Sequence, residues 1–432
     1  MNDTTFLYRD ISGVPQLFCE ESSLNEIAAT YGTPLYVYSR SQILRNYTSF
    51  AKAIQKTGEQ NWVSYAIKAN SNLEILKLLA SQGAGASVVS GGELLAALKA
   101  GFDPQKISFD GPGKTDDEIS LAITKNIFAI DIESMQELSV VNEIARSLGK
   151  KARICIRVNP HVDAKTHPYI STGLSHNKFG IPFEDAFSAY RSANNSPNIE
   201  IIGLHSHIGS LITDLAPFVE AAESISQFIK DLRQIEGIEL QHINIGGGQA
   251  IAYHNVVTHP LLPKDETANA IPTFEEFVSA VVPILSKTGH TINIEPGRAI
   301  IANACVMITK VLYTKSNGEK HFVIVDAAMN DLLRPSLYQA YHEIVPLQLA
   351  AKSHHKKVDV AGPICETGDF FAKDRLMPDA DRGDMLAVLC TGAYTSVLAS
   401  NYNLRPRAAE VLVDGNSSKI IKERERIENI IG

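Results

Sequence analysis

The sequence predicts an α/β fold, in which a (β/α)8 barrel of the TIM type is joined to a second, all-β domain. Three observations predict it. Short apolar runs alternate with amphipathic helical stretches between residues 62 and 298, as in a parallel sheet closed into a barrel. Unusual polar residues gather where those runs end, which is the face that carries the active site in such barrels. After about residue 300 the runs are strand-like and broken by Gly, Pro and Asn.

The eight barrel strands are expected at short runs rich in β-branched and aromatic residues, which favour strands. In chain order they are WVSYAIKA (62–69), ASVVS (86–90), ISFDGP (107–112), FAIDI (128–132), ARICIRVN (152–159), IIGLHSHIG (201–209), HINIGGG (242–248) and TINIEPGR (291–298).

Helices are expected between these strands. The stretches LEILKLLASQG (73–83) and GELLAALKAG (92–101) have apolar residues at helical spacing, and each closes on a glycine that suits a helix C-cap. The stretches DEISLAITKN (117–126) and SMQELSVVNEIARSLG (134–149) follow the same pattern.

The second domain is expected to be all-β, because helical periodicity is scarce after residue 300. Its strand-like runs are CVMITKVLYTK (305–315), KHFVIVDAA (320–328), KVDVAGPI (357–364), DMLAVLC (384–390) and AAEVLVDG (408–415). The N-terminal segment also lacks a βα rhythm, although LYVYSR (35–40) alternates like a strand. We therefore expect the barrel at 36–300 and the β-domain at 1–35 and 301–432, with a charged helix or tail at 419–429.

Composition excludes several classes of function. The 432 residues carry 40 Lys+Arg and 48 Asp+Glu, a net charge of −8 without a basic block, which disfavours binding to nucleic acid or an anionic membrane. The N-terminus lacks the pattern of a signal peptide, and no apolar run reaches the ~18 residues of a membrane helix. Five cysteines without a C-x-x-C pair favour neither a disulfide framework nor structural zinc. We expect a soluble, cytoplasmic protein without a metal.

Lys68 and two histidines stand at strand ends. Lys68 is either a surface lysine or a lysine that forms a Schiff base. An amine forms a Schiff base only when it is unprotonated, so neighbouring positive charge would favour the second role by lowering the pKa of the lysine. His205 and His207 lie two residues apart and so share one face of a strand. A metal pair is conceivable, but no third ligand or HExxH motif accompanies them. We interpret His205 as a buried, hydrogen-bonded side chain and His207 as an aromatic platform for a planar ligand.

Two further strand ends carry candidate residues. Gly246, Gly247 and Gly248 form either a tight turn or a loop whose bare N–H groups bind phosphate. Glu295 and Arg298 form either a salt-bridged turn or a site in which the carboxylate keeps a heterocyclic nitrogen protonated and the arginine binds phosphate or carboxylate. The GPGKT stretch (111–115) is not a P-loop, because Ser108 stands where the P-loop motif requires its first glycine.

The second domain offers a further set of polar side chains. Cys365 and Glu366 lie in GPICETGDFF, where the cysteine is either an inert thiol or an acid-base group. Arg334 and Tyr338 belong either to an ordinary helical turn at the surface or to a binding site. Tyr394 is either a residue of the hydrophobic core or a residue of the binding site.

Taken together and in this order, these residues resemble the barrel-type (fold type III) pyridoxal phosphate (PLP) dependent decarboxylases, and most closely their diaminopimelate branch. The resemblance runs from about residue 33 to 417. It is carried by YAIKANSN, VVSGGEL, RVNP, STGLSHNKFGI, GLHSHIGS, NIGGG, EPGRAIIANA, DAAMNDLLRPSLY, GPICETGDF, GAYTS, SNYN with RPR, and EVLVDG. The sequence departs from the family pattern at four positions, which are Ser87 for Asp, Leu211 for Gln, Ala328 for Gly and Thr395 for Gly.

The resemblance implies a role for each candidate residue. Lys68 would hold PLP covalently, His207 would stack on its ring and Glu295 would partner the ring nitrogen. Cys365 would return a proton to the substrate carbon after CO₂ leaves, and Glu366 would meet the distal amine. Arg298, Arg334 and Tyr338 would bind the distal carboxylate, and Tyr394 would also touch the substrate. The phosphate would be surrounded by Ser210, Gly246, Gly247, Gly248, Glu295, Pro296, Gly297, Arg298 and Tyr394.

The resemblance also implies a homodimer with shared active sites, because Cys365 and Glu366 would reach the partner's site. The implied reaction is decarboxylation of meso-2,6-diaminopimelate to L-lysine. The alternatives are a related decarboxylase of ornithine, arginine, carboxynorspermidine or a carrier-bound amino acid, and a silent homologue that only binds a partner. Arg334 favours a substrate with a distal carboxylate, and the presence of both Lys68 and Cys365 disfavours a silent homologue.

Overall fold

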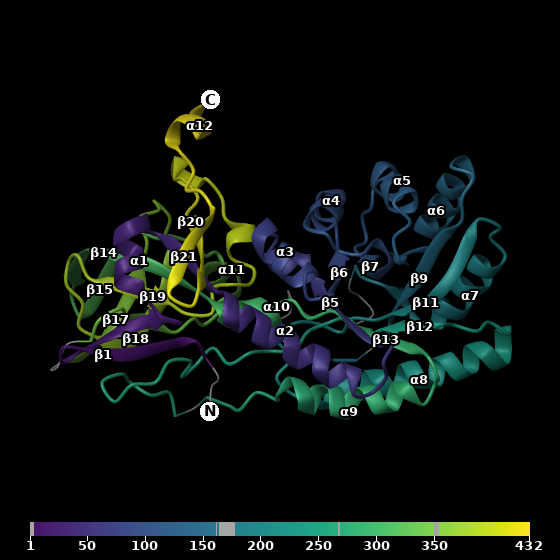
Figure 1. The fold of residues 1–432 in the computed structure, drawn as a ribbon, viewed down its shortest axis with the longest axis horizontal. Helices are drawn as coiled ribbons and strands as arrows, with labels where there is room; N and C mark the ends of the chain where they lie inside the picture. The colour runs from purple at the N-terminus through teal and green to yellow at the C-terminus, as the bar shows by residue number, and fades with distance from the viewer. Residues whose placement is uncertain (1–3, 161, 164–177, 267, 350–353) are drawn as a thin grey trace. The chain divides into compact units, whose positions relative to one another are not determined.

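A computed structural model describes residues 4–160, 162, 163, 178–266, 268–349 and 354–432. The chain divides into two compact units (Figure 1). The barrel unit comprises Tyr47–Ala250 and Ile271–Gly297, and the β unit comprises Met1–Asn46, Ile251–Ala270 and Arg298–Gly432. The expected boundary at residue 36 is wrong because β4 (Leu35–Ser39) pairs with strands of the β unit.

The barrel unit contains the eight predicted parallel strands, joined in a closed ring. Each strand pairs with the next in chain order, β8 pairs with β9, and β13 pairs with β5 to close the ring. A two-residue strand, β10 (Ile181–Pro182), adds to the edge of β9. The ring strands are β5 (Trp62–Ala66), β6 (Gly85–Val88), β7 (Ile107–Phe109), β8 (Ala129–Ile132), β9 (Ala152–Asn159), β11 (Ile199–His205), β12 (His242–Asn244) and β13 (Thr291–Ile294).

Most of these strands end earlier than the sequence predicts. At β12 the difference has a physical cause, because Gly246 and Gly248 adopt positive φ angles of 64° and 117°, which leave the strand ladder. Lys68, His207 and the glycines therefore lie in the loops and turns that follow the strands. The loops at this face of the barrel, and not the strands themselves, hold the candidate residues.

Helices cover the outside of the barrel, and several begin at side-chain caps (Figure 1). Thr115 and Glu118 form a reciprocal capping box at α5, and Gly101 closes α4 with a φ of 94°. Gly83 does not cap α3 as expected, since that helix already ends at Ala80. The helices are α2 (Arg40–Gln55), α3 (Leu73–Ala80), α4 (Gly91–Ala100), α5 (Asp116–Thr124), α6 (Met135–Ser147), α7 (Phe183–Asn194), α8 (Ala216–Glu236) and α9 (Phe274–Ser286).

The β unit is built on a nine-stranded sheet and a small antiparallel sheet. The order along the large sheet is β18-β17-β15-β14-β4-β20-β21, and β19 joins β14 to β16. Its strands are β4 (Leu35–Ser39), β14 (Cys305–Asn317), β15 (Lys320–Val325), β16 (Ile344–Pro346), β17 (His355–Ala361), β18 (Phe370–Pro378), β19 (Met385–Val388), β20 (Ala409–Asp414) and β21 (Ser417–Lys422). The small sheet consists of β1 (Phe6–Ile11), β2 (Val14–Cys19) and β3 (Ser22–Ser23).

The predicted all-β character of this unit is confirmed, with two differences. The charged helix or tail expected at 419–429 begins instead as a strand, because β21 pairs antiparallel with β20 up to Lys422, and a short helix, α12 (Ile427–Ile431), follows. Short helices α1 (Leu24–Tyr31), α10 (Arg298–Ile301) and α11 (Arg334–Tyr338) interrupt the strands.

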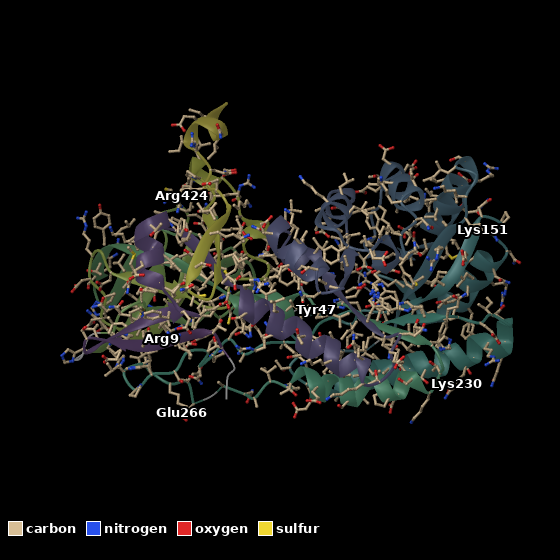
Figure 2. All side chains as sticks on the ribbon, in the orientation of Figure 1. Arg9, Tyr47, Lys151, Lys230, Glu266 and Arg424 are labelled. Carbon is tan, nitrogen blue, oxygen red and sulfur yellow. The ribbon has the colours of Figure 1, made fainter. Side chains whose placement is uncertain are left out.

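Charged side chains such as Lys151 and Lys230 lie exposed at the surface of the barrel unit (Figure 2). Within the described part of the chain, no helix has the length and apolar character needed to cross a bilayer.

Candidate active site

Lys68 lies half-buried in a short turn, η1 (Ile67–Ala69), directly after β5. The loop after β13 packs on this turn. The carbonyl of Pro296 accepts a backbone N–H from the end of β5 at 3.3 Å. A Cβ atom on Gly297 would fall 2.9 Å from the Cβ of Ala69, so glycine at 297 allows this close approach. The EPG loop and the lysine turn are therefore one packed structure.

Two acids lie close enough to Lys68 to feel its charge. Burial raises the pKa of Glu93, and the Val89 N–H and the Lys68 charge oppose that rise. Burial would also raise the pKa of Asp110, but Asp131, His205 and Lys68 together hold it below its usual value. Lys68 therefore has acidic neighbours, where the sequence analysis expected positive ones.

His207 follows β11 and packs against the glycine loop. Its Nδ1 accepts the N–H of Gly247 at 3.3 Å, so a neutral ring carries its proton on Nε2. Burial, with the Lys68 charge next, lowers the pKa of His207 well below its ordinary value. The ring is therefore neutral at pH 7, as an aromatic platform requires. A Cβ on Gly246 would lie 2.7 Å from Nδ1, which explains the glycine there.

The glycine loop after β12 approaches two other backbone segments very closely. A Cβ on Gly247 would fall 2.4 Å from the carbonyl oxygen of Glu295, and one on Gly248 would fall 2.4 Å from that of Gly209. The expectation that all the N–H groups are bare is wrong in part. The N–H of Gly246 donates to Asn244 Oδ1 at 2.9 Å, and that of Gly247 donates to His207. These two bonds fix the shape of the loop.

Glu295 is buried, and one of its oxygens is held by two donors. Ser108 Oγ and Asn244 Nδ2 each donate to Oε1 at 2.7 Å, while Oε2 lies 3.8 Å from Nε2 of His205. Burial and the Asp110 charge raise the pKa of Glu295 to about 7. This carboxyl group can therefore either hold a proton or pair with a cation that approaches it.

His205 lies in a buried cluster that the sequence analysis did not identify. Its Nδ1 is 3.1 Å from Asp131 Oδ2 and 3.8 Å from Asp110 Oδ1. Ser87, at a departure from the family pattern, donates to Asp110 Oδ2 at 2.6 Å. Burial and Asp110 raise the pKa of Asp131, which favours a proton shared between the two carboxyl groups. Asp110, Asp131 and His205 each offer a ligand atom within 4.8 Å of the others.

Arg334 opens α11 and is the largest side chain that is almost completely buried, with 2% exposed. Its Nη1 donates to Nε2 of His342 at 2.7 Å, and its guanidinium carbon lies 5.1 Å from the centre of the Tyr253 ring. No carboxylate of the described residues lies within 4 Å of this guanidinium group. Burial and the nearby Arg298 lower the pKa of Arg334, although a guanidinium group stays charged in proteins.

Arg298 opens α10 and is 5% exposed. Its Nη1 donates to the hydroxyl of Tyr253 at 2.9 Å, and its guanidinium carbon lies 4.9 Å from the centre of the Tyr394 ring. Tyr253 therefore touches both arginines. The sequence analysis missed Tyr253 and His342, and neither stands in a motif that would single it out.

The remaining predicted residues of the β unit are more open. Cys365 and Glu366 are exposed in the loop between β17 and β18, where the N–H of Cys365 donates to Asn403 Oδ1 at 2.9 Å. Tyr338 and Tyr394 are half-buried.

The structure thus gathers the predicted residues into two sets, one in each unit. The barrel set comprises Lys68, His207, Ser210, Gly246, Gly247, Gly248, Glu295, Pro296 and Gly297. The other set comprises Arg298, Arg334, Tyr338, Cys365, Glu366 and Tyr394. The first part of the STGLSHNKFGI motif, residues 171–177, lies outside the described residues.

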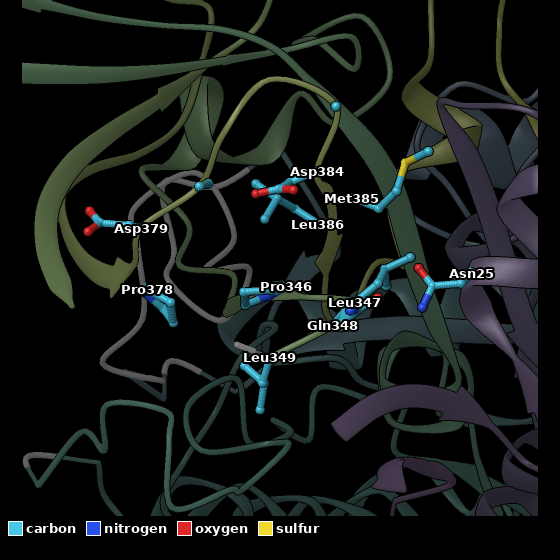
Figure 3. Close-up of a pocket in the computed structure, with 12 residues that line it drawn as sticks. Asn25, Pro346, Leu347, Gln348, Leu349, Pro378, Asp379, Asp384, Met385 and Leu386 are labelled. Carbon is cyan, nitrogen blue, oxygen red and sulfur yellow. The ribbon is translucent and has the colours of Figure 1, made fainter. Parts of the chain in front are cut away.

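A cavity of about 310 Å³ in the β unit is separate from both sets (Figure 3). It is lined by Asn25, residues 346–349 and residues 378–386 in part, which include no predicted site residue. The side chains of Asp379 and Asp384 at this cavity are exposed. We therefore do not include it in the candidate active site.

This chain is similar to known proteins over nearly its whole length. Residues 40–302 match the family described as pyridoxal-dependent decarboxylase, pyridoxal binding domain. A diaminopimelate decarboxylase of Aquifex aeolicus is 46% identical over 425 residues, which cover 98% of this chain and 96% of the relative.

Two solved structures are similar over nearly the whole chain. The diaminopimelate decarboxylase of Helicobacter pylori, complexed with L-lysine, has a TM-score of 0.87 and 40% identity, covering 94% of this chain and 98% of that one. The enzyme from M. jannaschii, also with L-lysine, has a TM-score of 0.90 and 38% identity, covering 100% and 97%. This chain therefore belongs to the diaminopimelate decarboxylase family of pyridoxal-dependent decarboxylases.

Proposed function

We propose that this chain catalyses the PLP-dependent decarboxylation of meso-2,6-diaminopimelate to L-lysine and CO₂. One observation carries the choice of substrate. Arg334 is buried beside Arg298, and its hydrogen-bond and ring partners are the neutral side chains of His342 and Tyr253. A buried cation without a counterion is unfavourable, so this pocket favours an anionic group of the ligand. The distal carboxylate of diaminopimelate is such a group.

The barrel residues fit the cofactor that the family implies. Lys68 is accessible enough to form a covalent bond, and His207 offers an uncharged aromatic face. The Gly246–Gly248 loop carries no side chains, so a bound group can approach its backbone closely, although the N–H groups of Gly246 and Gly247 donate within the protein. The carboxyl group of Glu295 is buried, and burial favours its protonation or its pairing with a cation. These residues would hold the cofactor's carbonyl carbon, ring face, phosphate and ring nitrogen respectively.

When bound, PLP accepts the electron pair that the departing CO₂ leaves on the α-carbon. Glu295 stabilises a proton on a ring nitrogen and so favours this electron acceptance. Lys68 provides the amine for covalent attachment. His207, being neutral, packs against a ring without adding charge. We assign the proton that returns to the α-carbon to the Cys365 thiol, so that CO₂ leaves and one proton is taken up in each turnover.

In the β unit, we assign the distal end of the substrate to several side chains. Arg298 and Arg334 would bind the distal carboxylate in charge-assisted hydrogen bonds, supported by Tyr338 and Tyr394. Glu366 would meet the distal amine. Cys365 and Glu366 lie exposed in their loop, so a second subunit could approach them. This exposure supports the proposal of a homodimer in which these two residues complete the active site of the partner subunit. We place this homodimer in the cytoplasm.

The test uses the purified protein reconstituted with PLP. We expect a yellow protein that releases CO₂ and L-lysine in equal amounts from meso-diaminopimelate. L-ornithine and L-lysine serve as control substrates. Each has a single carboxylate, and when this group is placed at the cofactor for decarboxylation, the other end presents an ammonium group to the arginine pocket. We therefore expect little turnover of either. Turnover of ornithine or lysine at rates equal to that of diaminopimelate would contradict the proposed substrate.

A further inference from the structure

We propose that Tyr253 and His342 are positioning residues for the distal carboxylate, because Tyr253 contacts both arginines and the neutral His342 holds Arg334 without cancelling its charge. This inference rests on the proposed function and deepens it. The two residues come from different segments of the β unit, and both are buried.

The tautomer of His342 is fixed by its two hydrogen bonds. Nδ1 lies 2.8 Å from the carbonyl oxygen of Leu389, which can only accept, so Nδ1 carries the proton. Nε2 is then an acceptor, and it receives the N–H of Arg334 Nη1 at 2.7 Å. A doubly protonated ring would direct an N–H at the guanidinium group. Burial, with the Arg334 charge next, accordingly lowers the pKa of His342 well below its usual value.

Tyr253 contacts both arginines. Its hydroxyl accepts from Arg298 at 2.9 Å, and its ring face lies 5.1 Å from the guanidinium carbon of Arg334. The Tyr253 ring also meets the His342 ring edge-on, with centroids 5.3 Å apart and planes at 84°. Arg298, Tyr253, His342 and Arg334 therefore form a continuous chain of contacts, and each arginine in it is held by an acceptor without charge.

The absence of charge on these acceptors has a chemical consequence. A carboxylate could hold an arginine equally well, and it would use the fork of N–H groups and cancel the positive charge. A neutral acceptor uses one N–H group and leaves the charge in place. Because charge-assisted hydrogen bonds are about twice as strong as neutral ones, the remaining charge matters for binding an anion. Neutral support thus makes the pocket specific for a carboxylate.

The matched variants His342→Gln and His342→Glu separate charge from support. Both residues have similar size and offer an acceptor to Arg334, but only Glu supplies a negative charge. The ligands are L-lysine, which keeps the distal carboxylate of diaminopimelate, and cadaverine, which lacks it. Dissociation constants for both ligands are measured by calorimetry on the protein with its PLP bound, alongside KM and kcat for meso-diaminopimelate.

We expect His342→Gln to bind L-lysine within about threefold of the parent, and His342→Glu to bind it about 50-fold more weakly, by analogy with other lost charge-assisted bonds. KM for diaminopimelate should follow the same order, with kcat changed little. Cadaverine, which presents an ammonium group there, should bind the Gln variant like the parent and should not lose affinity in the Glu variant, because the added carboxylate attracts a cation. Equal weakening of L-lysine binding in the Gln and Glu variants, or parallel weakening of both ligands, would overturn the inference, because a purely structural role predicts that result.

Tyr253→Phe provides a second test if the glutamate variant does not fold. It removes the acceptor for Arg298 and keeps the ring beneath Arg334, so L-lysine should bind several-fold more weakly and cadaverine should not change. The matched control is Tyr8→Phe, which removes a hydroxyl that donates to the carbonyl of Pro346 in the same unit and should leave both ligands unaffected. Unchanged L-lysine binding in Tyr253→Phe would contradict the role of Tyr253.

These measurements also distinguish failure of the inference from failure of the proposed function. A parent protein that turns over diaminopimelate, together with Gln and Glu variants that behave alike, contradicts only the role of the neutral acceptors. A parent protein that does not prefer L-lysine over cadaverine contradicts the carboxylate pocket itself, and the inference then fails with it.

Discussion

The barrel unit and the β unit each bury an unusual concentration of charge, but of opposite sign. The barrel unit places three carboxyl groups, Asp110, Asp131 and Glu295, around His205, and the pKa values of Asp131 and Glu295 are raised. The β unit instead buries Arg298 and Arg334 with neutral acceptors. The first environment favours a protonated or cationic group, and the second favours an anion. Under the proposed function, the first environment would suit the cofactor and the second would suit the distal carboxylate of the substrate.

The largest expected effect comes from Lys68→Ala in the barrel unit. The variant should lose covalent attachment of PLP and nearly all turnover while remaining folded, because a half-buried lysine in a turn contributes little packing. Borohydride reduction followed by mass spectrometry detects the attachment. The matched control is Lys77→Ala on α3, whose side chain is 50% exposed and should be dispensable. A reducible adduct that persists in Lys68→Ala would remove this residue from the proposed role.

A second large effect concerns whether Lys68 of one subunit and Cys365 of the other subunit form one active site. Lys68→Ala and Cys365→Ala should each be inactive, yet a mixture that exchanges subunits should regain about a quarter of the parent activity. Random exchange makes about half the dimers mixed, and each mixed dimer has one site without a lesion. Activity is measured after exchange has been demonstrated with differently tagged subunits. If exchange is complete and no activity returns, each site is built within one chain and the shared-site proposal is wrong.

An intermediate effect is expected for Arg334→Ala in the β unit. Loss of a charge-assisted fork to a buried carboxylate costs about 3 kcal/mol, so KM for diaminopimelate should rise roughly 100-fold. Steady-state kinetics measure it, and L-lysine should bind more weakly by a similar factor. Arg233→Ala is the control, since its partner Glu239 is an exposed surface residue and the variant should have parent kinetics. An unchanged KM in Arg334→Ala would separate this arginine from the substrate.

The smallest effect is a pH dependence of stability that the barrel acids predict. The pKa of Glu295 is raised to about 7, above the value near 4.5 of the unfolded chain, so the folded protein binds this proton more tightly. The stabilisation is complete below about pH 4.5 and is lost as the pH rises through about 7, at a slope of up to ~1.4 kcal/mol per pH unit.

Urea unfolding of the cofactor-free protein at several pH values measures this dependence. Glu295→Gln should remove part of the slope, and the comparison with the parent cancels the contributions of Asp331 and Glu343, whose pKa values are also raised to about 7. Identical slopes in the two proteins would show that Glu295 does not hold the proton.

The barrel was predictable from the sequence because its strands repeat a local pattern of apolar residues. The strand ends were less predictable, since the residues after β5, β11 and β12 remain apolar or glycine-rich while the backbone leaves the ladder. In the β unit, β18 and β21 escaped prediction because their polar, half-exposed residues give no clear alternation.

The site was predictable where residues stand in family motifs, as Lys68 and Glu295 do. Asp110 and Asp131 could have been found, because an acid within or directly after an apolar strand run is unusual. Tyr253 and His342 could not, because their role arises from contacts with arginines distant in the chain. Tyr253 even lies in a segment that the sequence pattern assigned to the barrel.

The central claim is that the buried positive charge of the β unit selects the far end of the substrate. Its most direct test is the ratio of kcat/KM for meso-diaminopimelate to that for L-lysine as substrate, in the parent and in Arg334→Glu. When L-lysine binds as a substrate, its only carboxylate lies at the cofactor and its ammonium end meets the arginines, whereas meso-diaminopimelate presents its second carboxylate to them. We predict a parent ratio of at least about 100, in line with one charge-assisted fork, and a collapse of that ratio in Arg334→Glu. A ratio that is unchanged by the reversal of charge would contradict the claim.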